Sequence, residues 1–313
     1  MEMLTDEWIA RVAAGNDPEA LAWFDRHGLL IAPGETAAEF AARLARLKTA
    51  HTMLLDDLRR RGAIEPVRGM RIGRDDGIPK SVLREAWAVT DRLYEVRPDW
   101  VPGFFVNESF GFLWGGCSLS DSESGLNLFI IRNNFRKRRR WLVYDRVELL
   151  AHELCHAARQ ALDDWRFEEY FAYRTAQAPL RRWFGNCFVR KFDAWLFLLP
   201  ILLLPVVQAV RGWYDAALPV WPFWILAALY PLFLAGRNLT AQRLAARARR
   251  RLTARNVPSP DAVLFRLTAA EIRELAESGD TMAVLNNFMA KDLRGVVLAR
   301  RLAAGPGREE KEA

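Results

Sequence analysis

The most prominent feature of the hydrophobic pattern is a pair of long apolar runs. Residues 194–210 and 216–235 contain no charged side chain, and only residues 211–215 separate them. Each run is close to the length that a helix needs to cross ~30 Å of hydrocarbon at about 1.5 Å per residue. Membrane helices also tolerate the prolines in these runs better than soluble helices do. The pattern therefore predicts a two-helix transmembrane hairpin over residues 191–236.

Charged residues around these runs indicate how the hairpin is oriented. Basic residues stand on both sides of it: Arg181, Arg182, Arg190 and Lys191 before, and Arg237, Arg243, Arg247, Arg249, Arg250, Arg251 and Arg255 after. By the positive-inside rule, both flanks lie in the cytoplasm. We therefore expect an integral protein of a bacterial-type inner membrane with both termini cytoplasmic. This distribution largely accounts for the net charge of +7, so nucleic-acid binding is not expected.

Polar and apolar positions at both ends of the chain follow a helical period. Residues 1–68 read as helical, with a capping box at Thr36–Glu39 and a stop at Gly62. Residues 237–313 read as a cytoplasmic helical tail, in which Asp280 caps a last helix running to about residue 304. A capped amphipathic pattern implies packing or partner docking and carries no chemistry by itself.

Between the N-terminal helices and the hairpin, residues 69–190 form a separate region with strand patterns. Aromatic and β-branched runs at 101–106, 110–118 and 126–132 predict three strands. Asp145 and Glu148 then open another helix as an Asp-type capping box. The expected fold class is α+β and mainly helical, with a small antiparallel or mixed sheet beside that helix.

The helix after Asp145 carries the pentapeptide His152-Glu153-Leu154-Cys155-His156. Two histidines four residues apart project from one helix face and can ligate one metal ion. Glu153 can then act as general base toward water whose pKa zinc lowers to ~7. Cys155 lies off the histidine face and is expected to be buried packing. The pattern is typical of zinc-dependent peptide hydrolysis, with His152, His156 and one further ligand holding the metal.

A following helix, over residues 165–177, offers two carboxylates for that third ligand, Glu168 and Glu169. A turn at Asp163 and Asp164 allows this helix to fold back beside the first. Geometry read from the sequence leaves both glutamates open.

The combination of motifs resembles the gluzincins, zinc peptidases with an HExxH helix and a glutamate ligand on a later helix. Glu169-Tyr170-Phe171-Ala172 fits the Glu-x-Phe-Ala form of that later helix. The resemblance covers roughly residues 100–178 and implies one zinc per chain, bound by His152, His156 and Glu169. Glu168 is the alternative ligand, or else a residue beside the ligands or at the surface. Several gluzincin families carry Asp four positions after the ligand glutamate, where this chain has Tyr173.

Other residues near the motif are weaker candidates. Tyr170, Tyr173 and Arg174 are candidates to stabilise the transition state, although a core or interface role is the favoured interpretation of each. An edge strand, either 110–118 or 126–132, could pair with an extended substrate backbone. The basic run at residues 136–140 could rest on anionic lipid headgroups.

Two functions fit these features. The first is an endopeptidase that cleaves proteins or peptides at the cytoplasmic face of a membrane. The second is a catalytically silent zinc-binding membrane scaffold or sensor that binds protein partners. Glu153 separates them, since a purely structural zinc site needs no carboxylate there and closes its fourth position with a protein ligand. The sequence offers no such ligand, which favours the enzyme.

Overall fold

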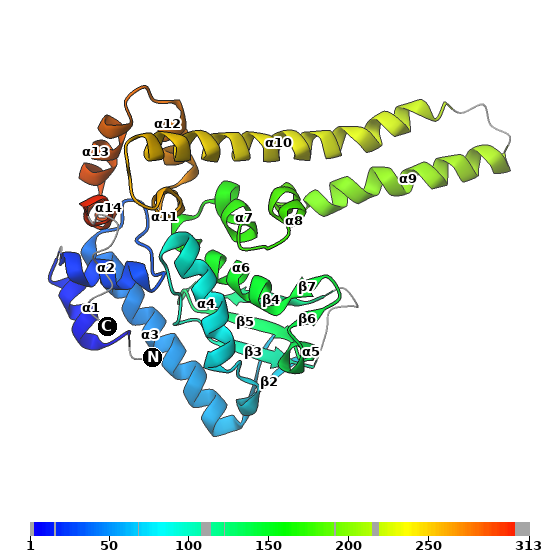
Figure 1. The fold of residues 1–313 in the computed structure, drawn as a ribbon. Coiled ribbons are helices and arrows are strands. Elements are labelled where there is room, and N and C mark those ends of the chain that lie inside the picture. Colours follow the sequence, from blue (N-terminus) through cyan, green and yellow to red (C-terminus); the bar gives the residue numbers. More distant parts are fainter. Residues whose placement is uncertain are drawn as a thin grey trace.

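The computed structural model describes residues 3–15, 17–67, 69–107, 114–121, 123–190, 192–214 and 219–303. It is mainly helical, at 66%, with small sheets, which confirms the expected α+β class with helices predominating. Helices and sheets form a body from which two long helices project to one side (Figure 1).

Three N-terminal helices form one flank of the body: α1 (Asp6–Ala13), α2 (Pro18–Arg26) and α3 (Ala37–Arg61). The capping box predicted for α3 is present, since Thr36 and Glu39 each accept a hydrogen bond from the backbone of the other. Gly62 ends the helix at φ 73°, a conformation that costs glycine little because it lacks Cβ. The expectation of helix is wrong for the next residues: once Gly62 has ended α3, the chain forms strand β1 (Ala63–Val67), antiparallel to β2 (Met70–Gly73).

The main sheet has the order β3–β5–β4, with β3 (Gly103–Val106), β4 (Gly116–Ser120) and β5 (Asn127–Arg132). β5 runs parallel to β3 and antiparallel to β4, so the sheet is mixed. β5 is central and deeply buried, whereas β4 lies at an edge. Of the two runs considered for the edge strand, β5 is therefore excluded, and the other corresponds to β4. Residues 108–113, which include the start of that run, lie outside the described residues.

Two helices that follow the sheet carry the sequence motif. The elements in this stretch are η1 (Arg74–Asp76), α4 (Lys80–Tyr94), α5 (Asn134–Lys137), β6 (Arg140–Trp141), β7 (Tyr144–Asp145), α6 (Arg146–Arg159), η2 (Gln160–Leu162) and α7 (Trp165–Tyr173). Asp145 caps α6 through the N–H groups of Val147 and Glu148. The capping box expected there is only half formed, because the Glu148 carboxylate accepts from the Gln177 N–H instead, at 2.8 Å. Asp163, at φ 47°, turns the chain back so that α7 packs against α6, as expected.

Next along the chain, short helix α8 (Pro179–Phe184) and η3 (Gly185–Cys187) lead into α9 (Asp193–Trp213) and α10 (Trp221–Ala254). Both α9 and α10 are long and apolar enough to cross a membrane, and only 17% of the most apolar stretch of each helix is buried. They lie side by side as the projecting hairpin of Figure 1. Such low burial is unlike the core helix of a soluble protein. α10 runs on without a break from the apolar part into its basic half.

Four further helices end the described chain: α11 (Pro260–Phe265), α12 (Ala269–Glu277), α13 (Thr281–Lys291) and α14 (Arg294–Ala303). The single last helix expected from Asp280 is interrupted, because Asp292 is extended (φ −154°, ψ 179°) and accepts a hydrogen bond from the Arg294 N–H. These helices do not form a peripheral tail. Phe265 stacks on Tyr94 with ring centroids 4.2 Å apart, inside a core that also contains α6 and α7.

Helix α6 lies at the junction of two hydrophobic cores. Leu150 and Leu154 pack into the core of the N-terminal helices and the sheet, whereas Cys155 and Ala158 pack into that of the C-terminal helices. Cys155 is 1% exposed, which agrees with the packing role expected for it. Burial on these faces fixes the rotation of α6 and leaves its histidine face turned toward α7.

Candidate metal centre

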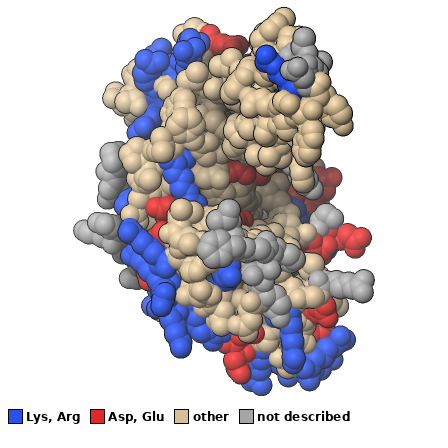
Figure 2. Space-filling view, turned by 90° about the vertical axis from the view of Figure 1, so that its right-hand side faces the viewer, with Lys and Arg blue, Asp and Glu red and all other residues tan. Residues whose placement is uncertain are grey.

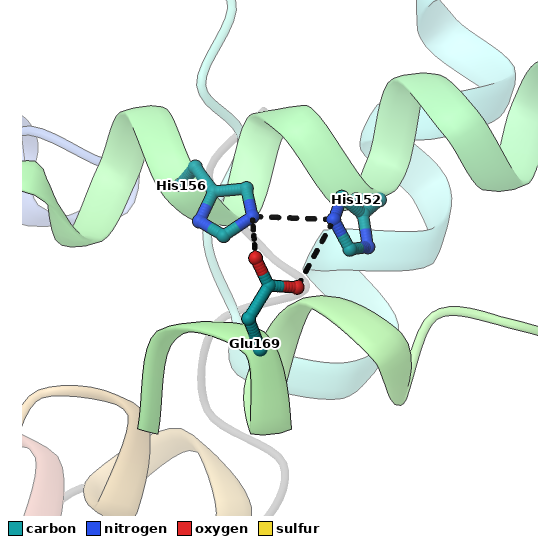
Figure 3. Close-up of side chains that lie close together, drawn as sticks. All are labelled: His152, His156 and Glu169. Atoms are coloured by element: carbon teal, nitrogen blue, oxygen red, sulfur yellow. Dashed lines mark hydrogen bonds and ion pairs between the residues drawn. The ribbon is translucent and has the colours of Figure 1, made fainter. Parts of the chain in front are cut away.

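Helices α6 and α7 bring three of the predicted ligands together (Figure 3). His152 and His156 project from one face of α6, one turn apart, and Glu169 reaches them from α7. The two histidine Nε2 atoms are 3.2 Å apart. The Glu169 carboxylate lies 3.5 Å from each, with Oε2 toward His152 and Oε1 toward His156. This group could bind a metal ion.

The size of this triangle suits a tetrahedral metal. Zinc binds nitrogen and oxygen ligands at ~2.0–2.2 Å, so two ligands of a tetrahedral site lie roughly 3.3–3.5 Å apart. The two histidine Nε2 atoms, 3.2 Å apart, approach that spacing. The two 3.5 Å distances end at different oxygens of Glu169, and with one ligand atom from each residue the three atoms lie within 4.8 Å of one another. Imidazole and carboxylate donors also serve several other first-row ions. The geometry therefore defines a group that could bind a metal ion, and it does not select which metal.

Each histidine ring is held by a second contact beyond the triangle. His156 Nδ1 lies 3.3 Å from Glu168 Oε2, and His152 hydrogen-bonds to the backbone of Ala172. A partner on the far nitrogen fixes the tautomer and orientation of a metal-binding imidazole. The structure therefore places Glu168 beside the ligands, on the side of His156 away from the triangle, and Glu169 within the triangle.

The triangle lies in a cleft of about 530 Å³. Glu153 lines this cleft together with His152, His156 and the edge strand β4. The cleft is large enough for part of a peptide, and it leaves the side of the triangle away from α6 and α7 without a fourth described protein ligand. The cleft thus holds the Glu153 carboxylate together with the three possible metal ligands, His152, His156 and Glu169.

The charges in the cleft are strongly coupled. Burial raises the pKa of Glu153. Burial also raises the pKa of Glu169, and with the negative charges of Glu153 and Glu168 this brings it to about 7, although the positive charge of His156 acts in the opposite direction. Burial alone would lower the pKa of His156, but the contact with Glu168 and the charge of Glu169 raise it to about 9. Burial and the neighbouring imidazole lower the pKa of His152. A divalent cation would supply positive charge that these buried carboxylates lack and would lower their pKa values.

Of the three residues considered for the transition state, only Tyr173 touches the triangle. Its ring packs edge-on against His152, with centroids 4.6 Å apart. Tyr170 is 5% exposed and accepts a hydrogen bond from Arg174 at 3.1 Å. Arg174 in turn pairs with Asp261 on α11 at 3.4 Å. Tyr170 and Arg174 thus face the C-terminal helices and do not line the cleft.

Several residues at the site carried no signal in the sequence. Cys117 and Ser118 of β4 line the cleft, and the buried Ser118 hydroxyl has no hydrogen-bond partner among the described residues. Asn127 of β5 donates to the Gln160 side chain at the end of α6, which joins the sheet to the motif helix. Serine and asparagine are common residues, so the sequence does not single out Ser118 or Asn127. Only the register of the strands places these two residues at the cleft.

Comparison with known proteins gave no match to a family model, a curated protein or a solved structure. The chain is a mainly helical α+β protein with two helices long and apolar enough to cross a membrane. It also holds a His152/His156/Glu169 group that could bind a metal ion.

Proposed function

We propose that the chain is a membrane-anchored zinc endopeptidase with its metal held by His152, His156 and Glu169. The observation that carries this proposal is the group of three ligand side chains, whose ligand atoms lie within 4.8 Å of one another, in a cleft that also holds Glu153. A purely structural zinc site has four protein ligands and no reason to keep a carboxylate beside an open cleft. The resemblance to gluzincins supports the same ligand set.

In this proposal each residue of the site has a separate task. Zinc, when bound, would polarise the scissile carbonyl and lower the pKa of water, which makes hydrolysis feasible near neutral pH. Glu153 accepts the proton from the attacking water and returns it to the leaving amine. A raised pKa suits this double task, because a base acts best when its pKa lies near the working pH. Glu168 orients His156, and Tyr173 packs against the ring of His152.

Strand β4 offers a binding edge for an extended peptide. The Asp121 N–H donates to the Leu126 carbonyl and the Arg132 N–H to the Gly115 carbonyl. Hydrogen-bonded pairs alternate along an antiparallel ladder, so odd-numbered residues of β4 face β5. The backbone groups of Gly116, Ser118 and Ser120 consequently point to the other side, where no described strand pairs with them. These three residues line the cleft, so a substrate paired there would pass the metal group.

The position of the cleft supports a substrate located near the bilayer. Figure 2 views the molecule from the side toward which the α9–α10 hairpin projects. It shows a hollow between the half that holds the hairpin and the half below, with acidic side chains visible inside. We infer that the hairpin crosses a bacterial-type inner membrane and that the body is cytoplasmic, since arginines flank both apolar runs.

Zinc analysis combined with a peptide-cleavage assay on detergent-purified full chain tests this proposal. We expect wild-type protein to hold about one zinc per chain and to cleave members of a peptide library, with new termini found by mass spectrometry. Glu153→Gln should keep the zinc and lose roughly 100-fold or more in turnover. Glu274→Gln, on the exposed face of α12, serves as the matched control.

Two results would count against the enzyme. Undiminished cleavage by Glu153→Gln would remove its assigned base. Zinc bound by wild type with no cleavage of any peptide would favour the silent zinc-binding scaffold or sensor. In that case Glu153→Gln would leave partner binding intact, whereas His152→Ala would abolish it.

A further inference from the structure

The turn between β6 and β7 breaks two local rules at once. Trp141 pairs with Tyr144, so Leu142 and Val143 form the whole turn. Leu142 has φ 50°, in the left-handed region that non-glycine residues rarely adopt, and Val143 does not share this positive φ. Two-residue hairpin turns ordinarily place glycine, asparagine or aspartate at a position of positive φ. Both side chains are also exposed, at 50% and 76%. Neither turn geometry nor core packing explains two apolar residues here, and such conflicts concentrate at functional positions.

The apolar character of this turn continues onto α8. Arg181 lies over the Tyr144 ring at 5.5 Å, and its Nη1 is 3.5 Å from the Val143 carbonyl oxygen. α8 exposes three large apolar side chains: Leu180 at 70%, Trp183 at 37% and Phe184 at 50%. We call these five exposed residues the docking face: Leu142, Val143, Leu180, Trp183 and Phe184. In Figure 1, β6, β7 and α8 lie on the side toward which the hairpin projects, and α8 leads into α9.

Basic side chains accompany the docking face. Within the run 136–140, Arg136 pairs with Asp76, and Arg139 and Arg140 both pair with Asp145. Lys137 and Arg138 are exposed, and in the described part of the chain no acidic partner lies within ion-pair distance of either. Exposed Arg182 of α8 and Arg190 beyond it add to them. In Figure 2, which views the molecule from the side toward which the hairpin projects, Lys and Arg side chains gather along the left of the molecule.

We propose that the docking face rests in the interface of an anionic bilayer, with Leu142 and Val143 between the headgroups and the acyl chains. Apolar side chains rimmed by unpaired cations are complementary to that environment. The contact gives the body a second attachment beside the hairpin. Because β7 leads directly into α6, this attachment also holds the metal group at a set position relative to the membrane. The inference rests on the proposal that the hairpin spans a bilayer, and it is independent of the chemistry at the metal.

Depth-dependent fluorescence quenching tests the contact. Full-length Val143→Cys carries an environment-sensitive label in vesicles of phosphatidylcholine and phosphatidylglycerol, and wild type treated alike corrects for labelling of native cysteines. Lipid-borne nitroxide near the headgroups should quench roughly half or more of the signal, and aqueous iodide should quench little. Met53→Cys on α3, where Met53 is 63% exposed, should show the reverse. Quenching of the Val143 label by iodide alone would overturn the proposal.

Two further measurements distinguish this contact from insertion of the hairpin alone and from burial against a protein. A label at Leu199→Cys, on the exposed face of α9, reports hairpin insertion alone: lipid quenching there but not at Val143 overturns the docking face and leaves the hairpin intact. Shielding of Val143 from both quenchers would indicate a protein partner or second copy, and would also overturn the proposal.

Substitution of the turn provides a test that preserves the fold. Leu142→Gly with Val143→Ser places glycine at the position of positive φ and a polar residue at the exposed position beside it, so thermal stability in detergent should be retained. In vesicles, amide hydrogen exchange across α8 should nevertheless become several-fold faster than in wild type, because the second attachment is lost. Val143→Ile is the conservative control and should exchange as wild type does. Equal exchange in all three proteins would refute the role assigned to the turn.

Discussion

The two neighbouring glutamates of α7 should contribute unequally to zinc affinity. Glu169 lies 3.5 Å from both histidine Nε2 atoms, whereas Glu168 lies 3.3 Å from the outward Nδ1 of His156. Structural zinc sites bind with about 10–16 kcal/mol over four ligands, so one ligand accounts for roughly 3 kcal/mol. Glu169→Gln should therefore weaken zinc binding on the order of 100-fold. Glu168→Gln removes only an orienting contact and should cost about 10-fold.

Competition with a fluorescent zinc chelator measures both constants on detergent-purified full-length protein at neutral pH. Glutamine keeps the size of each side chain, so unchanged thermal melting of the zinc-free variants verifies that α7 is intact. Glu274→Gln should bind zinc as wild type does. A larger loss for Glu168→Gln than for Glu169→Gln, or equal losses, would refute the assignment of the two roles.

Three further predictions concern stability. Chelation of zinc should lower the melting temperature of wild type and leave that of His152→Ala unchanged, as differential scanning fluorimetry can test. Arg159 is 0% exposed and pairs with Asp164 at 2.9 Å, so Arg159→Met should lose roughly 3–5 kcal/mol in chemical denaturation. Asp164→Asn, made in the Arg159→Met protein, keeps the helix cap and should recover part of the lost stability. If no stability is recovered, an unpaired Asp164 charge is not the cause of the loss. Burial lowers the pKa of His51 to about 4, so the unfolded chain binds the extra proton between pH 6.5 and 4 and stability falls as the pH drops through that window. His51→Gln should reduce this fall by ~1–2 kcal/mol after allowance for residual solvent contact, and an unchanged pH profile would refute the argument.

Several elements were predictable because their signals are local. Thr36 caps α3 through hydrogen bonds that span three residues, and the four-residue spacing of His152 and His156 places them on one face of any helix. The two uncharged runs likewise predict long apolar helices from composition alone. All of these depend on residues within one continuous segment of the chain, so the fold around them matters little.

Other predictions failed where a local signal was overridden or absent. The helix expected to run on from Asp280 is broken at Asp292. The carboxylate of Asp292 accepts hydrogen bonds from Arg294, which also pairs with Glu271 of α12. The terminal region expected to be a tail packs into the core behind α6, because Phe265 fills space beside Tyr94 that no local pattern reveals. Both outcomes depend on contacts between segments far apart in the sequence.

The sequence by itself determined which residues could bind a metal: an imidazole pair on one helix face and two adjacent carboxylates on a later helix. Only the tertiary structure decided how the carboxylates differ. Glu168 and Glu169 are about 100° apart around α7, so their roles depend on how that helix is rotated against α6. That rotation is set by burial of Phe167 and Phe171 against the C-terminal helices. Side-chain packing from the far end of the chain therefore selects Glu169 to face the two histidines.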